Sequence, residues 1–330
     1  MHHSAADSPD STDVPAPHAP TVPVPGRTLH GEPWEDDYAW LRNVDDPLTQ
    51  RYLGDERAFY EARTAHTRSL QQTMFEEMVS RTVPSDRSVS WSRGGLVYYT
   101  CTAAGKEYQQ LFRLGAEDSP AELVLDENDL ADGSPYFALG LREPSPDGGV
   151  VAYSVDLAGD EVFELRFRDT VAGKDLPETV ARSYYGGAWS ADSQTFFYVV
   201  HDKAYRPHQV WRHELGTDPA DDALVLQEDD DRFEVYCEGS RSGAYVVIRI
   251  QSKDTSEVWL VPTDRPGAPA RVVQPRVPGL LYSVALEPRP DGDVLLVVTD
   301  DAATEFRILQ APVAEPGRAG STELIGEDQA

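Results

Sequence analysis

After Val83 the chain is built of short apolar runs separated by turns rich in Gly, Pro, Asp and Ser, with no helical period. One order of features recurs: a turn, an apolar strand, a polar hairpin, a second alternating strand, and an acidic or Pro-rich connector. The turns begin at Ser92, Ser145, Ser190, Ser240 and Arg289, about 45 to 53 residues apart. The strands expected after the turns are Leu96–Thr100, Val150–Ser154, Thr195–Val200, Ala244–Ile250 and Val294–Thr299. The second strands expected are Tyr108–Leu114, Val162–Arg168, Gln209–Leu215, Glu257–Val261 and Glu305–Gln310.

A repeat of this length with about four strands per unit is typical of β-propeller blades. In the second strand of the second repeat, Phe163, Leu165 and Phe167 alternate with charged residues, so one strand face points into a core. A β-sandwich with chance spacing is the other interpretation. The pattern favours an all-β fold, a β-propeller with about five blades over residues 84–330, preceded by a short helical segment.

The sequence pattern does not decide whether the propeller ring is closed. Five repeats use the chain up to its last residues, and a propeller normally closes by pairing its terminal strands because an open ring exposes sheet edges. Two expectations remain: a closed five-bladed disc, or the first part of a larger ring.

Residues 26–83 form the predicted helical segment. Asp46 followed by Pro47 is a helix start, and Gly54 is expected to divide the region into two helices. His66 is expected to be packed and hydrogen-bonded rather than catalytic. An aromatic cluster ahead of the helix is expected to dock it onto another surface; it consists of Trp34, Tyr38 and Trp40, with Leu41. One helix face is marked by Tyr52, Phe59, Ala62, His66, Leu70, Met74 and Met78.

Residues 1–25 are rich in Pro, Ser, Asp and Ala without a hydrophobic period, which predicts a disordered tail. His2, His3 and His18 lie in it, and we expect no metal role for them.

Charge narrows the functional classes. The 29 basic and 57 acidic side chains give a net charge of −28, so nucleic acids and anionic membrane surfaces are poor partners. No apolar run approaches the roughly 18 residues that span a bilayer, and the N-terminus lacks the pattern of a secretory signal.

The two cysteines, Cys101 and Cys237, are expected to be buried, and their spacing fits neither a disulfide framework nor a zinc site. Their small number favours a cytoplasmic location.

Motifs for nucleophilic catalysis are missing from the sequence. No serine has glycine at both the −2 and +2 positions, and the nearest string, Gly239–Gly243, has Arg241 at its centre. We expect that string to be a turn between blades. No phosphate-binding loop, H-E-x-x-H or dinucleotide fingerprint occurs, so no cofactor is predicted.

Several clusters of polar residues are interpreted as structural or solvated segments rather than as sites. His201, His208 and His213 are expected at surface hairpin and strand positions rather than as a metal site. The segments 218–222 and 228–231 read as acidic connectors, and hydrolysis by carboxylates in the propeller channel remains a minor alternative. No catalytic, cofactor-binding or metal-ligating residue is predicted. An acidic stretch resembles a calcium loop only loosely and is explained by the Gly133 turn; it holds Asp126, Glu127, Asn128, Asp129 and Asp132.

A set of short motifs, in order, resembles the prolyl oligopeptidase family of serine peptidases, and its oligopeptidase B branch in particular. The resemblance covers about residues 25 to 315. The motifs are residues 38–42, 45–47, 52–53 and 75–78 in the helical segment, and 98–100, 105–108, 125–128, 145–148, 206–213 and 255–257 in the repeats.

The resemblance implies a seven-bladed propeller inserted between an N-terminal segment and a C-terminal α/β-hydrolase domain. The hydrolase domain holds the Ser, Asp and His triad, and in this branch the acidic residues that select Lys or Arg before the cut. The propeller admits only short peptides. The helical segment, residues 26–83, would pack on the hydrolase domain.

This sequence contains no counterpart of the family's catalytic residues, so none is carried over. We expect the chain to be the propeller part of such a peptidase, with a missing hydrolase domain as partner and short basic peptides as substrates of the intact enzyme. By itself it is expected to be inactive. The alternative is a free-standing five-bladed propeller that acts as a binding or interaction module.

Overall fold

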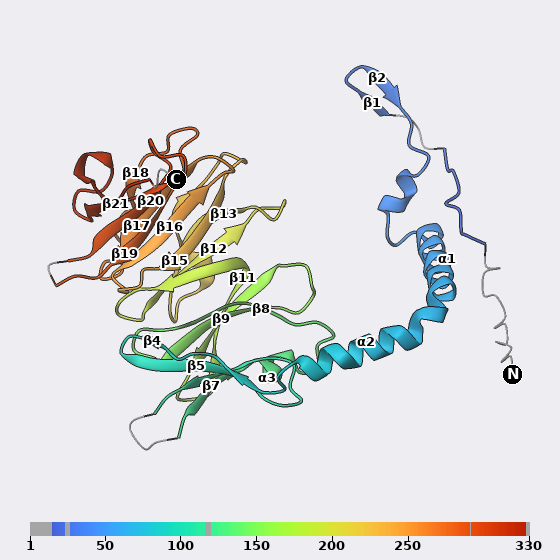
Figure 1. Ribbon diagram of the computed structural model, residues 1–330, viewed down its shortest axis with the longest axis horizontal. Helices are drawn as coiled ribbons and strands as arrows, with labels where there is room; N and C mark the ends of the chain where they lie inside the picture. Colours follow the sequence, from blue (N-terminus) through green and yellow to red (C-terminus); the bar gives the residue numbers. More distant parts are fainter. Residues whose placement is uncertain (1–14, 24–26, 116–119, 291, 328–330) are drawn as a thin grey trace, which may run out of the picture. The chain divides into compact units, whose positions relative to one another are not determined.

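The computed structural model describes residues 15–23, 27–115, 120–290 and 292–327. They fall into two compact units, Met1–Val83 and Pro84–Ala330, which are described separately (Figure 1).

The first unit is mainly helical. The Asp46 carboxylate accepts a hydrogen bond of 2.8 Å from the Leu48 amide, which confirms the predicted N-cap with proline at the first helical position. The helix then runs through Gly54, so the predicted break there is wrong. A glycine costs a helix only about 1 kcal/mol relative to alanine, and a 3₁₀ turn that begins at Ala65 separates the two helices instead. The elements are β1 (Arg27–Leu29), β2 (Glu32–Trp34), η2 (Ala39–Arg42), α1 (Pro47–Thr64), η3 (Ala65–Thr67) and α2 (Arg68–Arg81).

Contacts around Trp40 tie the start of this unit together. The Trp40 indole donates a hydrogen bond of 3.1 Å to the Pro20 carbonyl, and its ring meets Tyr52 edge-on at 6.0 Å. The Val22 amide donates to the Asp37 carbonyl at 3.0 Å. Residues 1–14 and 24–25 of the predicted tail, His2 and His3 among them, lie outside the described residues.

The predicted apolar helix face is largely exposed within this unit. His66 is exposed too, so the expectation that it is packed is wrong; the half of the face that runs from His66 to Met78 is exposed, whereas Tyr52 packs against Trp40. The large apolar side chains of α2 that remain exposed are Leu70, Met74, Phe75, Met78 and Val79.

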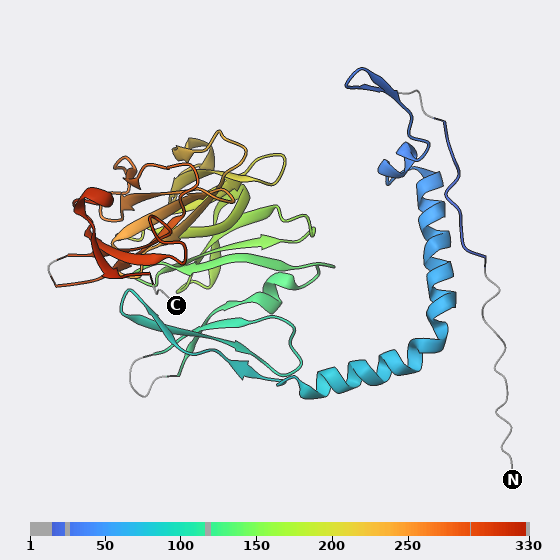
Figure 2. The same cartoon turned by 45° about the horizontal axis from the view of Figure 1, so that its top comes forward.

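The described part of the second unit contains a five-stranded, an eleven-stranded and a four-stranded sheet, and the eleven-stranded sheet divides into three antiparallel groups of four strands, two of which share β11 (Figure 2). We name the resulting five groups blade 1 to blade 5 in chain order. Blade 1 has a divided first strand, because β3 and β4 both pair with β5. Blade 1 contains β3 (Asp86–Arg87), β4 (Trp91–Arg93), β5 (Leu96–Thr102), β6 (Gln110–Arg113) and β7 (Glu122–Asp126), and α3 (Glu127–Ala131) follows it. Blade 2 contains β8 (Ala138–Pro144), β9 (Val150–Asp156), β10 (Phe163–Asp169) and the first part of β11 (Lys174–Trp189).

The remaining blades repeat this order. Blade 3 contains the last part of β11, β12 (Thr195–His201), β13 (Pro207–Glu214), η4 (Pro219–Asp221) and β14 (Ala223–Gln227). Blade 4 contains β15 (Glu234–Gly239), β16 (Tyr245–Gln251), β17 (Ser256–Pro262) and β18 (Arg271–Gln274). Blade 5 contains β19 (Tyr282–Glu287), β20 (Val294–Thr299), β21 (Arg307–Pro312), η5 (Arg318–Gly320) and β22 (Thr322–Ile325).

Two features join the middle blades into one eleven-stranded sheet. The long strand β11 pairs with β10 through its first part and with β12 through its last part, so it is the outer strand of blade 2 and the inner strand of blade 3. A short parallel contact pairs Gly187 of β11 with Glu238 of β15.

The repeat predicted from the sequence corresponds to these blades, with an offset of one strand. Each expected strand pair matches the second and third strands of a blade within a few residues, as β9 and β10 do. The recurring turns join the first and second strands of one blade. The prediction that the Gly239–Gly243 string lies between blades is therefore wrong, since it connects β15 to β16.

Apolar clusters fill the spaces between successive blades. Tyr98 and Tyr153 anchor the cluster between blades 1 and 2, and Phe167 and Phe196 the cluster between blades 2 and 3. Val235 and Ile248 belong to the next cluster, and Leu295 to the one between blades 4 and 5. Cys237 is buried as expected, whereas Cys101 is only half-buried.

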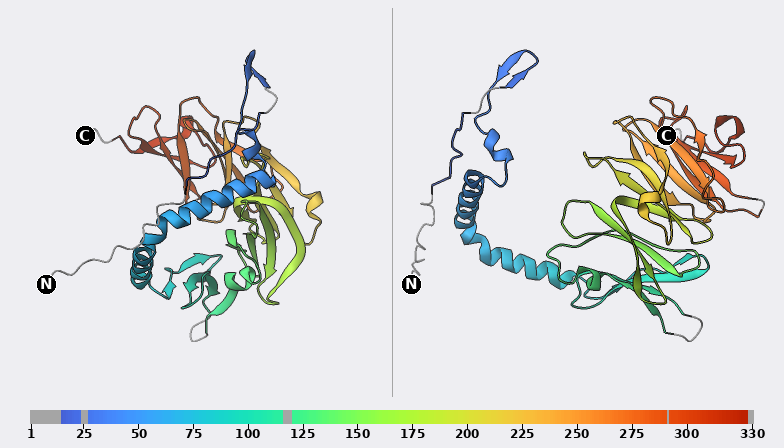
Figure 3. Two further views of the ribbon diagram at one scale, coloured as in Figure 1. Left: turned by 90° about the vertical axis from the view of Figure 1, so that its right-hand side faces the viewer. Right: turned by 180° about the vertical axis from the view of Figure 1, so that it is seen from behind.

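The views in Figure 3 show the blades in chain order from β5 to β21. Among the described residues, no strand of blade 5 pairs with blade 1. No helix in the described part of the chain is long and apolar enough to cross a membrane.

Candidate functional site

The first strands of blades 1 to 4 meet around a hollow of about 370 Å³, which we call the inner hollow. Blade 1 contributes Arg93 from β4, and blade 2 contributes Glu143 from β8. The remaining walls come from β11, β15 and β16. Its lining residues are Arg93, Glu143, Tyr185, Gly186, Gly187, Tyr236, Cys237, Glu238, Gly239 and Arg249.

Glycine makes the close approach of β11 and β15 possible. Gly186 has φ of +85°, and a Cβ atom there would lie 2.5 Å from the Cys237 carbonyl oxygen. A side chain at Gly187 would meet the Phe196 ring at 2.5 Å. The backbone of β11 therefore forms one wall of the inner hollow without a side chain at these two positions.

Two loose ion pairs face this hollow. The Arg93 guanidinium lies 3.3 Å from a Glu143 carboxylate oxygen, and the Arg249 guanidinium lies 3.5 Å from Glu238. Both distances exceed the 2.7–2.9 Å or so of a strong charge-assisted hydrogen bond. The Nε atom of Arg249 is buried and has no hydrogen-bond partner in the described part of the protein.

Burial raises the pKa of the Glu143 carboxyl above its ordinary value. The positive charges of Arg93 and Arg142 act in the opposite direction, and the negative charge of Glu238 adds to the rise. These charges therefore influence one another across the inner hollow.

Two tyrosines border the same space. The Arg249 guanidinium lies 6.0 Å from the centre of the Tyr236 ring, and the Tyr236 hydroxyl donates to Glu234. Burial and this hydrogen bond raise the pKa of Tyr236 to about 12. Tyr185 packs edge-on against Phe163, with ring centres 4.8 Å apart.

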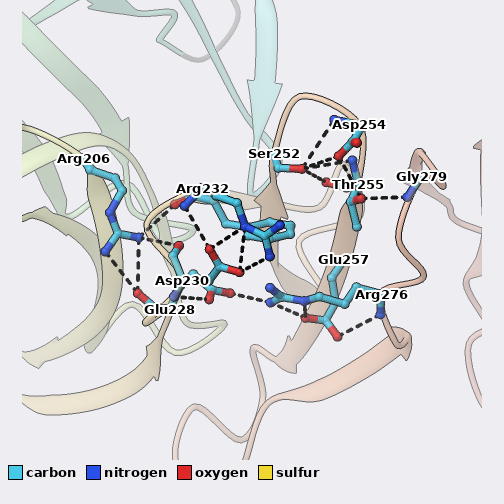
Figure 4. A network of polar contacts seen from close by, with 11 residues as sticks. Arg206, Glu228, Asp230, Arg232, Ser252, Asp254, Thr255, Glu257, Arg276 and Gly279 are labelled. Atoms are coloured by element: carbon cyan, nitrogen blue, oxygen red, sulfur yellow. Dashed lines mark hydrogen bonds and ion pairs between the residues drawn. The ribbon is translucent and has the colours of Figure 1, made fainter. Parts of the chain in front are cut away.

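Tyr236 and Arg249 also line a second, larger hollow of about 800 Å³, which we call the rim basin. Loops that follow β12, β14 and β16 form it. Arg206 fixes one of these loops by donating to the carbonyl oxygens of Asp230 at 3.1 Å and Phe233 at 2.9 Å (Figure 4). The rim basin is lined by Asp202, Ala204, Arg206, Asp231, Arg232, Glu234, Tyr236, Arg249, Gln251, Ser252 and Lys253.

Arg276, in the segment after β18, connects the rims of blades 3 and 4. Its guanidinium pairs with Glu228, at the end of blade 3, and with Glu257 of β17 at 2.8 Å (Figure 4). It also lies 4.2 Å from the centre of the Phe233 ring. The side chains of Glu228 and Glu257 are only 8% and 9% exposed, so this arginine is the shared counter-charge of two nearly buried carboxylates. Burial lowers the pKa of Arg276, but the hydrogen bonds to Glu228 and Glu257 outweigh it and raise the pKa.

The turn between β16 and β17 is fastened to the chain leading into blade 5. The Thr255 hydroxyl accepts a hydrogen bond of 3.0 Å from the Gly279 amide, and the Ser252 hydroxyl accepts one of 3.1 Å from the Thr255 amide (Figure 4). Ser252 also donates to Asp254 at 3.1 Å. The rim of blade 4 is therefore rigidly held.

The three histidines of blade 3 are not a surface group, and in this the prediction is wrong. His201 and His213 are buried, with the Nδ1 atom of His213 2.8 Å from an Asp222 oxygen and its ring stacked on Phe167. An acidic partner and an aromatic face allow the His213 side chain to be buried. The Nδ1 atom of His201 lies 2.8 Å from the Asp202 backbone carbonyl, and His208 is half-buried. Within the described ranges, no group of three His, Cys, Asp or Glu residues could hold a metal ion.

The acidic stretch after β7 is a helix start. Asp126 accepts a hydrogen bond of 2.9 Å from the Asn128 amide and caps α3, a short helix that the sequence did not predict. Gly133 adopts φ of +76° in the turn that follows.

The serines of the recurring turns have a structural role. Ser145 and Ser190 each donate to the aspartate two residues later and accept from the amide five residues later, as Ser190 does from Thr195 at 2.9 Å. Ser240 accepts from the Tyr245 amide at 3.0 Å in the same way.

The sequence pattern predicted neither the inner hollow nor the contacts of Arg276. Arg206 and Glu257 did lie in motifs that carry the family resemblance, which is the one signal that pointed to the rim. Arg93, Glu143 and Glu238 come from strands that the sequence pattern left in connectors.

Comparisons with known proteins support the same family. Residues 17–330 match the family model described as "Prolyl oligopeptidase, N-terminal beta-propeller domain". The chain is 31% identical over 305 residues to Protease 2 of Moraxella lacunata, covering 90% of this chain and 44% of that protein. It is 30% identical to dipeptidyl aminopeptidase BI of Pseudoxanthomonas mexicana, covering 88% and 42%.

Solved structures agree. Oligopeptidase B from Leishmania major superposes with a TM-score of 0.85 at 25% identity, and that from Trypanosoma brucei with 0.82 at 29%. In both cases 96% of this chain and 47% of the other is covered, so the chain spans about half the length of the relatives it matches. The chain therefore belongs to the prolyl oligopeptidase family, and it carries that family's N-terminal β-propeller domain in an oligopeptidase B-like form.

Proposed function

We propose that this chain is the gating part of an oligopeptidase B-like serine peptidase, in which the propeller limits access to short peptides that are cut after Lys or Arg. The observation that carries the proposal is the family match over residues 17–330, combined with coverage of only about half of each relative. Relatives of twice the length have room for a second domain, and the α/β-hydrolase domain is the partner we propose.

The exposed apolar face of α2 supports such a partner. Leu70, Met74 and Met78 recur at helical spacing and are exposed within their unit, which is unusual for a helix that has no binding surface. We propose that residues 26–83 pack on the hydrolase domain through this face.

Charge supports basic peptides as substrates. A net charge of −28 gives a negative potential that raises the local concentration of cationic peptides. A cytoplasmic location belongs to the same proposal, supported by Cys101 and Cys237, which are both free thiols.

The test combines the full chain with the separately produced C-terminal part of Moraxella lacunata Protease 2, which this chain does not cover and in which we propose the hydrolase domain. We expect a complex in which a short Arg-containing peptide is cut while cleavage of an unfolded protein substrate is suppressed. The change Met74→Glu should weaken the complex, and Glu77→Gln on the same helix should not. If the hydrolase domain cuts both substrates equally with and without the chain, gating is refuted.

The alternative function, a free-standing binding module, would need a closed ring in which the first and last strands of the propeller pair with each other. The strands of blades 1 and 5 do not pair in the described part of the chain, so no observation favours that alternative.

A further inference from the structure

The inner hollow has an unusual balance of groups for a space of its size. It offers two guanidinium groups, Arg93 and Arg249, and two carboxylates, Glu143 and Glu238, together with two tyrosine rings. Its formal charge is therefore zero, although the whole chain carries −28. A lone cation or a lone anion would have to disturb an existing pair without being compensated.

The two pairs are not saturated. Their closest atoms are 3.3 Å and 3.5 Å apart, and neither pair makes a hydrogen bond of normal geometry in the described residues. The Arg249 Nε atom has no partner, which shows that its donors are incompletely used. Each acid and each base therefore keeps hydrogen-bonding capacity for another group.

The walls leave room for a small ligand. Gly186, Gly187 and Gly239 contribute no side chains, and a volume of about 370 Å³ is at the lower end of the roughly 300–1,000 Å³ of small-molecule pockets. Tyr236 and Arg249 line both the inner hollow and the rim basin, so the two hollows border the same two side chains.

We propose that the inner hollow binds a small zwitterion, namely a dipeptide with free termini. Its ammonium group pairs with Glu143 and Glu238, and its carboxylate pairs with Arg93 and Arg249. A ligand with both charges satisfies the unused capacity of both pairs at once, which neither a cation nor an anion does. All four charged groups belong to this chain, and the proposal does not depend on the gating function.

The ligand panel tests the charge requirement on the unaltered full-length chain. Isothermal titration with L-alanyl-L-alanine should give a Kd of about 1 mM or tighter. The N-acetylated, the C-amidated and the doubly blocked dipeptides should each bind at least tenfold more weakly. Equal affinity for the doubly blocked dipeptide, or no binding of the free dipeptide up to about 10 mM, would overturn the proposal.

Variants test the location. Glu143→Gln and Arg249→Gln should each weaken dipeptide binding at least tenfold. Their matched controls, Glu164→Gln and Arg265→Gln, alter a partly exposed and an exposed ion pair whose residues do not line the hollow, and they should bind as the unaltered chain does. Circular dichroism confirms folding of each variant, and unchanged binding by folded Glu143→Gln and Arg249→Gln would place the ligand elsewhere and refute the site. If a variant does not fold, the ligand panel alone decides.

Discussion

Asp222 is the residue on which the buried polar contacts of blade 3 depend. It lies within hydrogen-bond distance of His213 Nδ1, at 2.8 Å, and accepts from the Tyr198 hydroxyl at 2.7 Å, while its side chain is 2% exposed. Burial, followed by the hydrogen bond to Asp222, raises the pKa of Tyr198, so the tyrosine remains a neutral donor. One carboxylate thus satisfies two side chains that could not otherwise be buried.

We expect Asp222→Ala to lower the free energy of unfolding by about 3 kcal/mol, because it leaves two buried polar groups without a partner. Urea unfolding followed by circular dichroism measures the change. Asp221→Ala is the matched control at the neighbouring exposed position and should cost less than about 0.5 kcal/mol. Equal effects of the two substitutions would contradict this account.

Asp156 gives a pH dependence of known sign. Burial alone would raise its pKa, but amide hydrogen bonds from Ala158 and Gly159 at 2.8 Å and from Glu161 at 2.9 Å outweigh burial and lower it below 3.8. A lowered pKa means that its stabilisation is present above the unfolded value and is lost as the pH falls through the folded value. The stability difference between the unaltered chain and Asp156→Asn should therefore shrink as the pH decreases below about 3.8. A difference that stays constant from pH 7 to pH 2.5 would exclude this role of the carboxylate.

Among the elements, the second and third strands of the blades could be predicted from sequence. The apolar run of β9 reflects burial on both faces of the sheet, and the alternation in β10 reflects one buried and one partly exposed face. The first strands could not, because they carry glycine, charge or little length: β4 is three residues long, and the end of β11 contains Gly186 and Gly187. The inner hollow is built from these strands, so its residues come together only through the topology.

The contact between β11 and β15 depends on Gly186. We expect Gly186→Ala to destabilise the chain by about 2–4 kcal/mol, since it adds a clash of 2.5 Å with the Cys237 carbonyl to the strain of a positive φ. Gly216→Ala has a similar φ of +80° but meets nothing within 4 Å, so it should cost only about 1 kcal/mol. Thermal unfolding compares the two, and equal costs would show that the approach of the strands does not require glycine.

Arg276 tests how the blade rims are held together. Arg276→Gln should cost about 3 kcal/mol, because Glu228 and Glu257 would remain nearly buried without their counter-charge. Adding Glu228→Gln and Glu257→Gln to this variant should restore part of the loss, as two uncompensated charges are removed. Urea unfolding of the single and triple variants measures it. A triple variant that is less stable than the single one would mean that the charges are not the cause.

At the scale of the whole molecule, the first prediction concerns catalytic activity. We expect the full chain to show no turnover of an arginine ester above the uncatalysed rate, because its sequence contains no G-x-S-x-G serine. Ser240 lies in the Gly239–Gly243 string, which comes nearest to a G-x-S-x-G motif, so Ser240→Ala is the control and should leave the rate of ester hydrolysis unchanged. Turnover that disappears in Ser240→Ala would refute the structural role that the hydrogen bond from Tyr245 assigns to this serine.

The net charge of −28 makes a prediction about the folded chain as a whole. Repulsion among excess carboxylates opposes the compact state, and added salt screens it, since the Debye length falls from about 30 Å at 0.01 M to about 8 Å at 0.15 M. Salt also weakens attractive surface pairs such as Arg57–Glu61, but an exposed pair contributes only about 0–1 kcal/mol. With 57 acidic and 29 basic side chains the repulsive contribution is the larger one, so the urea midpoint should rise between 10 and 150 mM NaCl. A midpoint that falls over this range would mean that the local ion pairs outweigh the overall repulsion.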